Sequence, residues 1–231
     1  MVVKATPLTF VVHALAIACA VLVLVWNIYF RGGLAWEATD KNLIFNLHPV
    51  MMLIGFIILG GEAIVSYKAL PFKHEVKKVI HLTLHAMALA LGIFGICAAF
   101  KNHNESGILN LYSLHSWLGI GVISLYGVQW IYGFITFFYP GGSSSLRRES
   151  LPWHVLFGIF VYVLAVGNAT LGFLEKLTFL ETLAGLEKFG TEAYLVNFTA
   201  IATVLFGAFV LLTVYAQKEQ PQEAEDHYTA I

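Results

Sequence analysis

The sequence has few charged residues. Only 12% of its 231 residues are Asp, Glu, Lys or Arg, whereas 58% are hydrophobic. An average soluble domain carries about 25% charged and roughly 45–50% apolar residues, so this chain has too few charges to cover a surface exposed to water. The net charge of −1 leaves no basic field for nucleic acid. These deficits exclude an ordinary soluble domain and favour a protein embedded in a membrane.

Cysteine is equally scarce. The chain has two, Cys19 and Cys97, and both lie inside apolar runs. They cannot form the disulfide framework of a small secreted domain, and we interpret them as small buried apolar residues. The first apolar run is too long for the core of a cleavable signal and lacks a small-x-small exit site. We therefore expect it to remain as a membrane helix.

The apolar residues come in blocks of about 20, the length that crosses a hydrocarbon core roughly 30 Å thick. Six such runs are predicted spans, of which the fourth is the longest: 10–30, 47–67, 80–100, 112–138, 153–173 and 194–216. The short spacers, rich in Gly, Pro, Asn and Ser, predict antiparallel neighbours. The expected fold is an all-α domain of six transmembrane helices over residues 1–216. The polar, acidic residues 217–231 are predicted to form a disordered tail.

The lysines and arginines of the loops predict the orientation of the helices, because cytoplasmic loops carry an excess of both. The richer side holds Lys4, Lys68, Lys73, Lys77, Lys78, Arg147, Arg148 and Lys218. The other side holds Arg31, Lys41, Lys101, Lys176 and Lys188. The richer side is expected to be cytosolic, which places both termini in the cytosol.

Four histidines begin four consecutive spans. His48, His81, His115 and His154 open the second to the fifth run, each about one helix and one loop after the last. Because consecutive spans run in opposite directions, His48 and His115 lie near the outer face, and His81 and His154 near the cytosolic face. Each pair comes from two parallel helices and is suited to clamp a flat metal macrocycle between axial imidazoles. A haem fits this description, and two axial ligands leave it no open position for oxygen chemistry. We therefore expect two electron-carrying haems inside a four-helix core, flanked by the first and sixth spans.

Other interpretations stay open at this point. A lone intramembrane histidine is more often a hydrogen-bonded core residue than a ligand. His85 lies four residues after His81 on the same helical face, so spacing alone allows either to be the inner ligand. The histidines would also suit proton or metal sites in a secondary transporter or metal-ion carrier. A third possibility is a haem-binding structural or sensor protein without turnover.

Charged residues flank the predicted pairs. Basic residues precede both His81 and His154, which either reflects cytosolic orientation or marks a site for a small anionic reductant. Of the acidic residues, Glu62 is expected to face a cavity or a polar partner. Glu175 is expected either to pair with Lys176 or to approach the outer haem. Aromatic residues between the pairs, among them Phe56, Phe94, Tyr126 and Trp130, are candidates for an electron path.

Five segments then identify a resemblance that extends from about Phe10 to Tyr215. They are Asn46-Leu-His-Pro-Val-Met-Met, Lys77-Lys-Val-Ile-His81, Tyr112-Ser-Leu-His-Ser-Trp-Leu-Gly119, Leu151-Pro-Trp-His154 and Gly172-Phe-Leu-Glu-Lys176. With these segments the chain resembles the ascorbate-reducible transmembrane cytochrome b561 family, most closely its plant members.

The resemblance implies a six-helix homodimer with two haem b groups. One haem would be ligated by His48 and His115 and the other by His81 and His154, and His81 is favoured over His85 because the ligand follows a Lys-Lys pair. The implied activity is that of an ascorbate-dependent ferrireductase or monodehydroascorbate reductase. It would move electrons from cytosolic ascorbate to monodehydroascorbate or ferric chelates across a vacuolar, plasma or endosomal membrane.

The resemblance also assigns roles to residues around the haems. Lys78 and Arg147 match the cytosolic ascorbate site, and His74 stands there where a lysine is common. His103 and Tyr112 match the outer substrate site. Together Lys78, Arg147, His103 and Tyr112 are the implied catalytic residues. Tyr67 falls near the inner haem, and the outer haem would be lined by Asn110, Leu111, Tyr112, Ser113 and Glu175.

Overall fold

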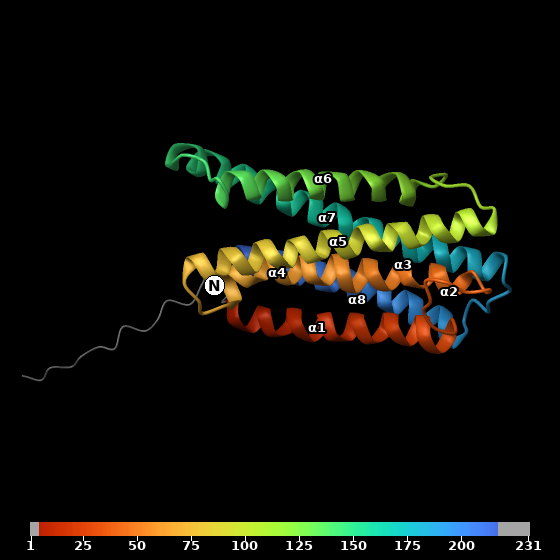
Figure 1. The fold of residues 1–231 in the computed structure, drawn as a ribbon. Helices are drawn as coiled ribbons and strands as arrows, with labels where there is room; N and C mark the ends of the chain where they lie inside the picture. The colour runs from red at the N-terminus through yellow and green to blue at the C-terminus, as the bar shows by residue number, and fades with distance from the viewer. Residues whose placement is uncertain (1–4, 217–231) are drawn as a thin grey trace, which may run out of the picture.

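A computed structural model describes residues 5–216, which form a bundle of long helices (Figure 1). In chain order the elements are α1 (Ala5–Val25), the π-helical turn η1 (Trp26–Phe30), α2 (Asn42–Phe45), α3 (Leu47–Val50), the π-helical η2 (Met51–Ile58), α4 (Leu59–Ala69), α5 (His74–Ser106), α6 (Leu114–Phe137), α7 (Ser144–Thr182) and α8 (Thr191–Tyr215). Six segments are long and apolar enough to cross a membrane: Ala5–Phe30, Asn42–Ala69, His74–Ser106, Leu114–Phe137, Ser144–Thr182 and Thr191–Tyr215. The all-α prediction with six spans is confirmed. The tail predicted at 217–231, and the terminal Lys4 and Lys218, lie outside the described residues.

The helices differ in length from the predicted runs. The fourth span, expected to be the longest, has 24 residues, whereas α7, the fifth span, has 39. At 1.5 Å per residue α7 extends roughly 58 Å, well beyond a hydrocarbon core of about 30 Å. It begins at a serine cap, where Ser143 Oγ accepts a hydrogen bond of 3.2 Å from the Leu146 amide, and it continues through Arg147 and Arg148. The prediction failed because an apolar run stops at charged residues, whereas the helix continues through them.

The helices pack in pairs (Figure 1). The helix α1 lies along α8, α4 along α5, and α6 along α7. The largest fully buried apolar side chains, such as Trp26, Ile57, Val65 and Phe206, belong to the first, second and sixth spans. By contrast α6 buries only Val122, Tyr126 and Thr136. The densest packing is therefore displaced towards α1 and α8, away from the part of the bundle where the paired histidines lie.

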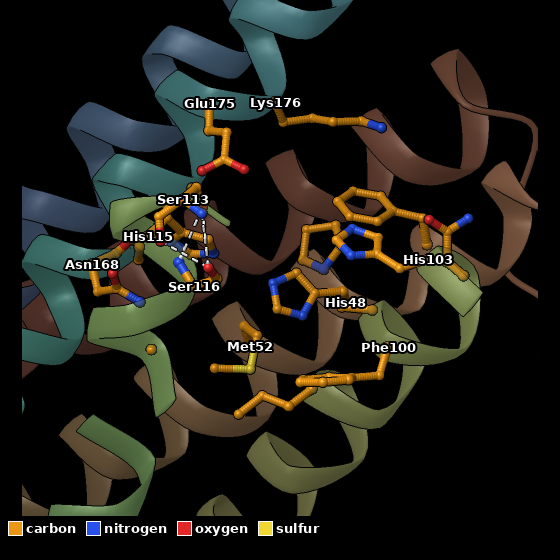
Figure 2. A pocket seen from close by; sticks show the side chains of 18 of the residues that line it. His48, Met52, Phe100, His103, Ser113, His115, Ser116, Asn168, Glu175 and Lys176 are labelled. Carbon is orange, nitrogen blue, oxygen red and sulfur yellow. Dashed lines mark hydrogen bonds between the residues drawn. The ribbon is translucent and has the colours of Figure 1, made fainter. Parts of the chain in front are cut away.

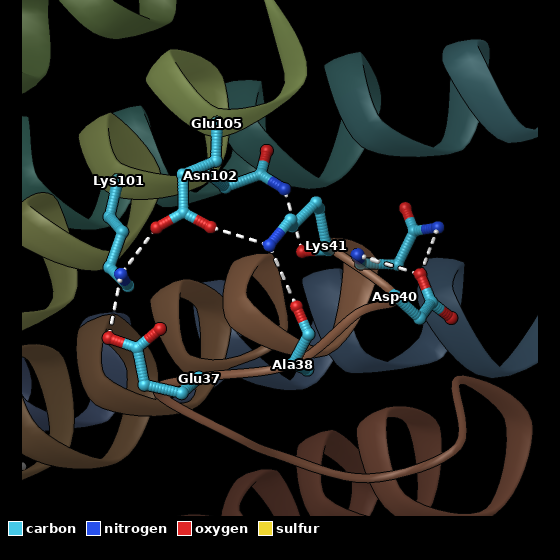
Figure 3. A network of polar contacts seen from close by, with 8 residues as sticks. Glu37, Ala38, Asp40, Lys41, Lys101, Asn102 and Glu105 are labelled. Carbon is cyan, nitrogen blue, oxygen red and sulfur yellow. Dashed lines mark hydrogen bonds and ion pairs between the residues drawn. The ribbon is translucent and has the colours of Figure 1, made fainter.

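The segment between η1 and α2 is held against the C-terminal end of α5 by alternating charges (Figure 3). Lys101 Nζ lies 2.9 Å from Glu37 Oε1 and also pairs with Glu105, whose other oxygen is 2.7 Å from Lys41 Nζ. The Asn102 side-chain amide donates a hydrogen bond of 2.7 Å to the Lys41 carbonyl. These contacts hold the loop before α2 in place, and α2 leads directly into His48.

The structure tests the expectations for Glu62 and for the two cysteines. Glu62 has the polar partner that was expected, because its Oε1 lies 2.9 Å from Nδ1 of His13 on α1. Cys19 is buried as expected. Cys97 is exposed on α5, so the interpretation of both cysteines as buried was wrong for that residue. Apolarity marks a residue as membrane-embedded but does not reveal whether it faces lipid or protein.

Candidate functional site

The histidine pair predicted at the outer face, called the outer pair below, joins the second span to the fourth. His48 lies on the short helix α3, and His115 lies in the first turn of α6, with their ring centroids 6.0 Å apart and the rings inclined at 84°. The π-helical η2 begins three residues after His48, and such turns are frequent at functional sites. At α6 a capping box of Ser113 and Ser116 fixes the start of the helix, two residues before His115. The histidines are thus positioned by local backbone features on each helix.

The inner pair joins the third span to the fifth. His81 on α5 and His154 on α7 have ring centroids 6.4 Å apart at an angle of 68°. Two imidazoles bound to opposite sides of one metal at ~2 Å each place their ring centres roughly 6 Å apart. Both pairs have a spacing that suits one shared metal. Two nitrogens leave four positions of a six-coordinate metal for a macrocycle.

Backbone carbonyls hold three of the four imidazoles by Nδ1. His48 Nδ1 lies 2.9 Å from the Gly95 oxygen, His81 Nδ1 lies 2.9 Å from that of Ala63, and His115 Nδ1 lies 3.0 Å from that of Asn168. A carbonyl only accepts, so Nδ1 carries the hydrogen and Nε2 keeps its lone pair. This is the usual second contact of a metal-binding histidine. Nε2 of these three side chains is the atom left to coordinate.

His154 has a different neighbour. Gln129 Nε2 lies 2.9 Å from His154 Nδ1 and donates a hydrogen bond of 2.6 Å to the His154 carbonyl. The oxygen and nitrogen of an amide are assigned from such networks. The bond donated to the His154 carbonyl fixes Nε2 of Gln129 on this side, so Nδ1 of His154 faces an amide donor. The inner pair therefore has a side-chain partner where the other ligand candidates have backbone partners.

His85 is engaged elsewhere. Its Nδ1 is hydrogen-bonded to the phenol of Tyr126, and its ring packs against His81 with centroids 4.3 Å apart. His81, by contrast, forms the ring contact with His154. The geometry favours His81 as the ligand of the inner pair and leaves His85 as its packing neighbour.

Two glycines make room for the imidazoles on the facing helices. A Cβ at Gly172 on α7 would lie 2.7 Å from His115 Cε1, and one at Gly133 on α6 would lie 2.9 Å from His154 Cε1. Both distances are shorter than real contacts of a Cβ, so a side chain at either position would displace the ring. The helices α6 and α7 therefore each carry one histidine and one glycine that receives the histidine of the other.

A cavity of about 270 Å³ opens beside the outer pair (Figure 2). Its walls come from the second span, the end of α5, the start of α6 and the outer half of α7. The structure brings together here every residue predicted for the outer site: His48, His103, Asn110, Leu111, Tyr112, Ser113, His115 and Glu175. Its lining is mostly apolar with few polar groups, as is usual for a cofactor pocket.

His103 and Tyr112 lie together at this cavity. Their rings stack with centroids 6.2 Å apart and an interplanar angle of 27°, and half of Tyr112 is exposed. Partial burial, followed by the negative charge of Glu175, raises the pKa of the Tyr112 phenol. The phenol therefore stays protonated at neutral pH and is available as a hydrogen-bond donor.

The residues predicted at the cytosolic end also converge. The Tyr67 ring lies 5.1 Å from that of His81 and 6.0 Å from that of His74. Lys78 Nζ forms an ion pair of 2.7 Å with Glu75, and the Glu75 carboxylate also lies within electrostatic reach of His74 and Arg147. The basic cluster predicted from the sequence is present, but it surrounds an acidic residue that was not anticipated.

Three residues of the two sites were missed by the sequence reasoning. Glu75 precedes Lys78 by three residues, a spacing that joins opposite charges on a helix. Gln129 and Asn168 are polar residues inside spans, where polarity is costly and usually functional. Asn168 accepts from His115 through its carbonyl, and its buried side-chain oxygen has no hydrogen-bond partner among residues 5–216. The signal for all three was present, but it did not show which helix face each residue occupies.

The residues present fit a haem at each end. Each pair offers two nitrogens at a suitable spacing, glycines receive the rings, and the outer pair borders a cavity with an unpartnered amide oxygen. Within residues 5–216 no three His, Cys, Asp or Glu side chains gather as a site for a bare metal ion.

Comparison with known proteins points to the same chemistry. A family model of eukaryotic cytochrome b561 matches residues 47–180, which include all four paired histidines. Transmembrane ascorbate ferrireductase 1 of Arabidopsis thaliana is 73% identical over 215 residues, 93% of this chain and 90% of that protein. Ascorbate-specific transmembrane electron transporter 2 of Zea mays is 65% identical over 95% of this chain and 94% of its own length. A human transmembrane ascorbate-dependent reductase is 42% identical over 87% of this chain and 79% of its own length. The resemblance to this family, and to plant members above the human one, is confirmed.

Proposed function

Because this chain belongs to the eukaryotic cytochrome b561 family, we propose that it moves electrons across a membrane from cytosolic ascorbate to monodehydroascorbate or a ferric chelate on the opposite side. It is an oxidoreductase of the membrane, as its family and its relatives named as ferrireductases and electron transporters support. The observation that carries the proposal is the arrangement of four histidines in two pairs, three of them with Nδ1 on a carbonyl and Nε2 left to coordinate.

Two haem b groups would be held by His48 with His115 and by His81 with His154. When bound, they would supply one-electron chemistry. The carbonyls of Gly95, Ala63 and Asn168 orient the rings and keep Nε2 deprotonated. The protein contributes ligands, orientation and an apolar surrounding.

Ascorbate would bind at the basic end. Its monoanion is attracted by Lys78 and Arg147, with His74 beside them. On oxidation the ascorbate monoanion loses one electron and one proton and becomes the radical anion. His74, close to Tyr67 and to the carboxylate of Glu75, is a base within reach of that proton. Glu75 competes with the substrate for Lys78, because the two side chains form an ion pair.

Aromatic rings in contact lead from His81 to Phe56, which lines the cavity beside His48 and His115. Phe56 packs on Tyr126 with centroids 4.7 Å apart, and Tyr126 lies 5.5 Å from His85, which touches His81. Of the candidates named from the sequence, Phe56 and Tyr126 therefore lie on one path. Phe94 stacks instead on Trp36, and Trp130 donates a hydrogen bond to the Leu82 carbonyl and stacks on Phe134.

The acceptor would bind beside His103 and Tyr112. Tyr112 donates a hydrogen bond from its phenol, because its raised pKa prevents it from acting as a base at neutral pH. His103, stacked on Tyr112, would supply a proton to an acceptor that needs one. Stacking of the two rings holds both at the edge of the outer cavity.

The proposed orientation places the α4–α5 and α6–α7 connections in the cytosol, because Lys68, Lys73, Lys77, Lys78, Arg147 and Arg148 gather there. We propose a homodimer in a vacuolar, plasma or endosomal membrane. A side-specific proteolysis or labelling experiment on sealed vesicles tests the orientation.

The first tests are the absorption spectrum of the purified protein and a charge reversal at Lys78. Purified protein should be red, and ascorbate should sharpen the α band of six-coordinate low-spin haem. Lys78→Glu should slow reduction by ascorbate, whereas reduction by dithionite, which bypasses the site, should remain normal. Normal ascorbate reduction in that variant would show that the donor site is misplaced. A colourless protein would favour the transporter or metal-ion carrier instead.

A further inference from the structure

Lys176 is a half-buried cation in the wall of the outer cavity without an assigned role. It follows Glu175 on α7, and its ammonium lies 4.0 Å from the ring centroid of Phe45. The Phe45 ring in turn lies 5.8 Å from that of His48. Figure 2 shows the Lys176 side chain extended across one side of the pocket, opposite Met52 and Phe100. The positive charge is therefore held close to the outer histidine pair.

The nearby carboxylates do not neutralise this charge. Glu175 points into the pocket, and no ion pair joins it to Lys176 among the residues that the structure describes (Figure 2). Glu192 attracts Lys176 from a distance, but that carboxylate is paired with Arg31 and accepts a hydrogen bond of 2.9 Å from Trp26 Nε1. Arg31 itself repels Lys176. The expected pairing of Lys176 with Glu175 is not made.

An ammonium removed from water is costly unless an anion or an aromatic face compensates for it. The Phe45 ring offers Lys176 the aromatic face but not the anion. An anionic oxygen that enters the cavity would supply that anion. Lys176 presents its charge there at the same face as His103 and Tyr112, which line the cavity with it.

We propose that Lys176 seats an anionic oxygen in the outer cavity, and that an electron acceptor which supplies this oxygen is selected by its negative charge. The inference rests on the proposed function and specifies its acceptor class. Two sources share the required chemistry: the carboxylate or enolate of an arriving acceptor, and a propionate of the outer haem itself.

The test compares two one-electron oxidants of opposite charge. Full-length protein in detergent is reduced with dithionite, freed of excess reductant, and mixed in a stopped-flow instrument with anionic ferricyanide or cationic hexaammineruthenium(III). Lys176→Met should lower the rate constant for ferricyanide about five-fold relative to that for hexaammineruthenium. Lys176→Arg should restore the ratio. Lys188→Met removes a charge from the exposed α7–α8 loop at the same end and should leave the ratio unchanged.

The two sources give different results. If the acceptor supplies the anion, the ratio of rate constants changes and the propionate bands of the infrared difference spectrum stay in place. If a haem propionate supplies it, those bands and the outer reduction potential shift in Lys176→Met, while the ratio stays the same. A variant with no change in ratio, potential or infrared bands would overturn the inference, and so would an equal effect of Lys188→Met. Lys176→Gln replaces Lys176→Met if the latter fails to fold.

The inference and the proposed function fail in distinguishable ways. Wild-type protein that ascorbate reduces, with a ratio and bands indifferent to Lys176, refutes the inference alone. Protein that only dithionite reduces, with a ratio dependent on Lys176, refutes the ascorbate step alone. Protein that binds no haem refutes both.

Discussion

A single hydrogen decides which atom of a histidine can bind a metal. Carbonyls at His48, His81 and His115 hold that hydrogen on Nδ1, so a neighbouring helix determines that Nε2 is the nitrogen left to coordinate. The sequence predicted the depth of these residues but not their partners, because the partner depends on how each helix is rotated about its axis. The same limit applies to His81 and His85, which share one helical face.

Replacing His81 should therefore differ sharply from replacing His85. His81→Leu removes the ring that faces His154 at 6.4 Å and should lower the haem content to about half, since each haem needs two axial ligands. His85→Leu removes only a contact with Tyr126 and should leave both haems bound. A pyridine haemochrome assay on purified protein measures the content. The assignment of the inner ligand would be reversed if His85→Leu lost a haem and His81→Leu kept it.

Glu75 should limit the affinity for ascorbate. Its carboxylate pairs with Lys78 at an exposed position and lies within electrostatic reach of His74 and Arg147. Glu75→Gln frees that basic cluster for an anion and should lower the KM for ascorbate by a few-fold at low ionic strength, with little effect in high salt. Glu149→Gln, which removes an exposed acid on α7, serves as the control. An unchanged KM in Glu75→Gln would mean that ascorbate binds away from Lys78.

At the scale of helices, the sequence predicted which segments cross the membrane and at which end each histidine lies. It did not predict that α7 continues through Arg147, because charged residues end a hydropathy window without ending a helix. It also could not locate Gln129 or Asn168, although both are polar residues in apolar runs. The depth of a residue in the membrane follows from its position along its own helix. Its contacts depend also on how two helices are rotated and how far apart they lie.

A glycine-to-alanine substitution, which adds one methyl group, tests how closely α6 and α7 approach each other. A Cβ at Gly172 would lie 2.7 Å from His115 Cε1, so Gly172→Ala should displace the ring and lower occupancy of the outer haem by half or more. Gly167→Ala is the matched control on the same helix, where nothing lies within 4 Å of an added Cβ. It should bind haem normally and gain slightly in stability, by about 0.5–1 kcal/mol. Equal haem loss in both variants would attribute the effect to α7 as a whole and not to the ring contact.

At the scale of the molecule, the two proposed sites would act in series, and they are chemically unlike. The basic residues gather at the end with His81 and His154, whereas the cavity with Tyr112 and Lys176 lies at the end with His48 and His115. An electron that enters at the first site must pass the second before it leaves. Loss of the His48–His115 pair should therefore stop transfer across the membrane without stopping entry.

An experiment in sealed vesicles distinguishes entry of the electron into the protein from its transfer across the membrane. Wild-type protein in vesicles that contain ferricyanide should oxidise external ascorbate through the molecules whose basic end faces outward. His115→Leu should still be reduced by external ascorbate at its remaining haem, because His81 and His154 are untouched, but internal ferricyanide should stay oxidised. His154→Leu should lose both steps, since its basic end no longer leads to a haem. The absorbance of ferricyanide and of the α band measures the two steps in one cuvette. Continued reduction of internal ferricyanide by His115→Leu would exclude a serial path through the outer pair.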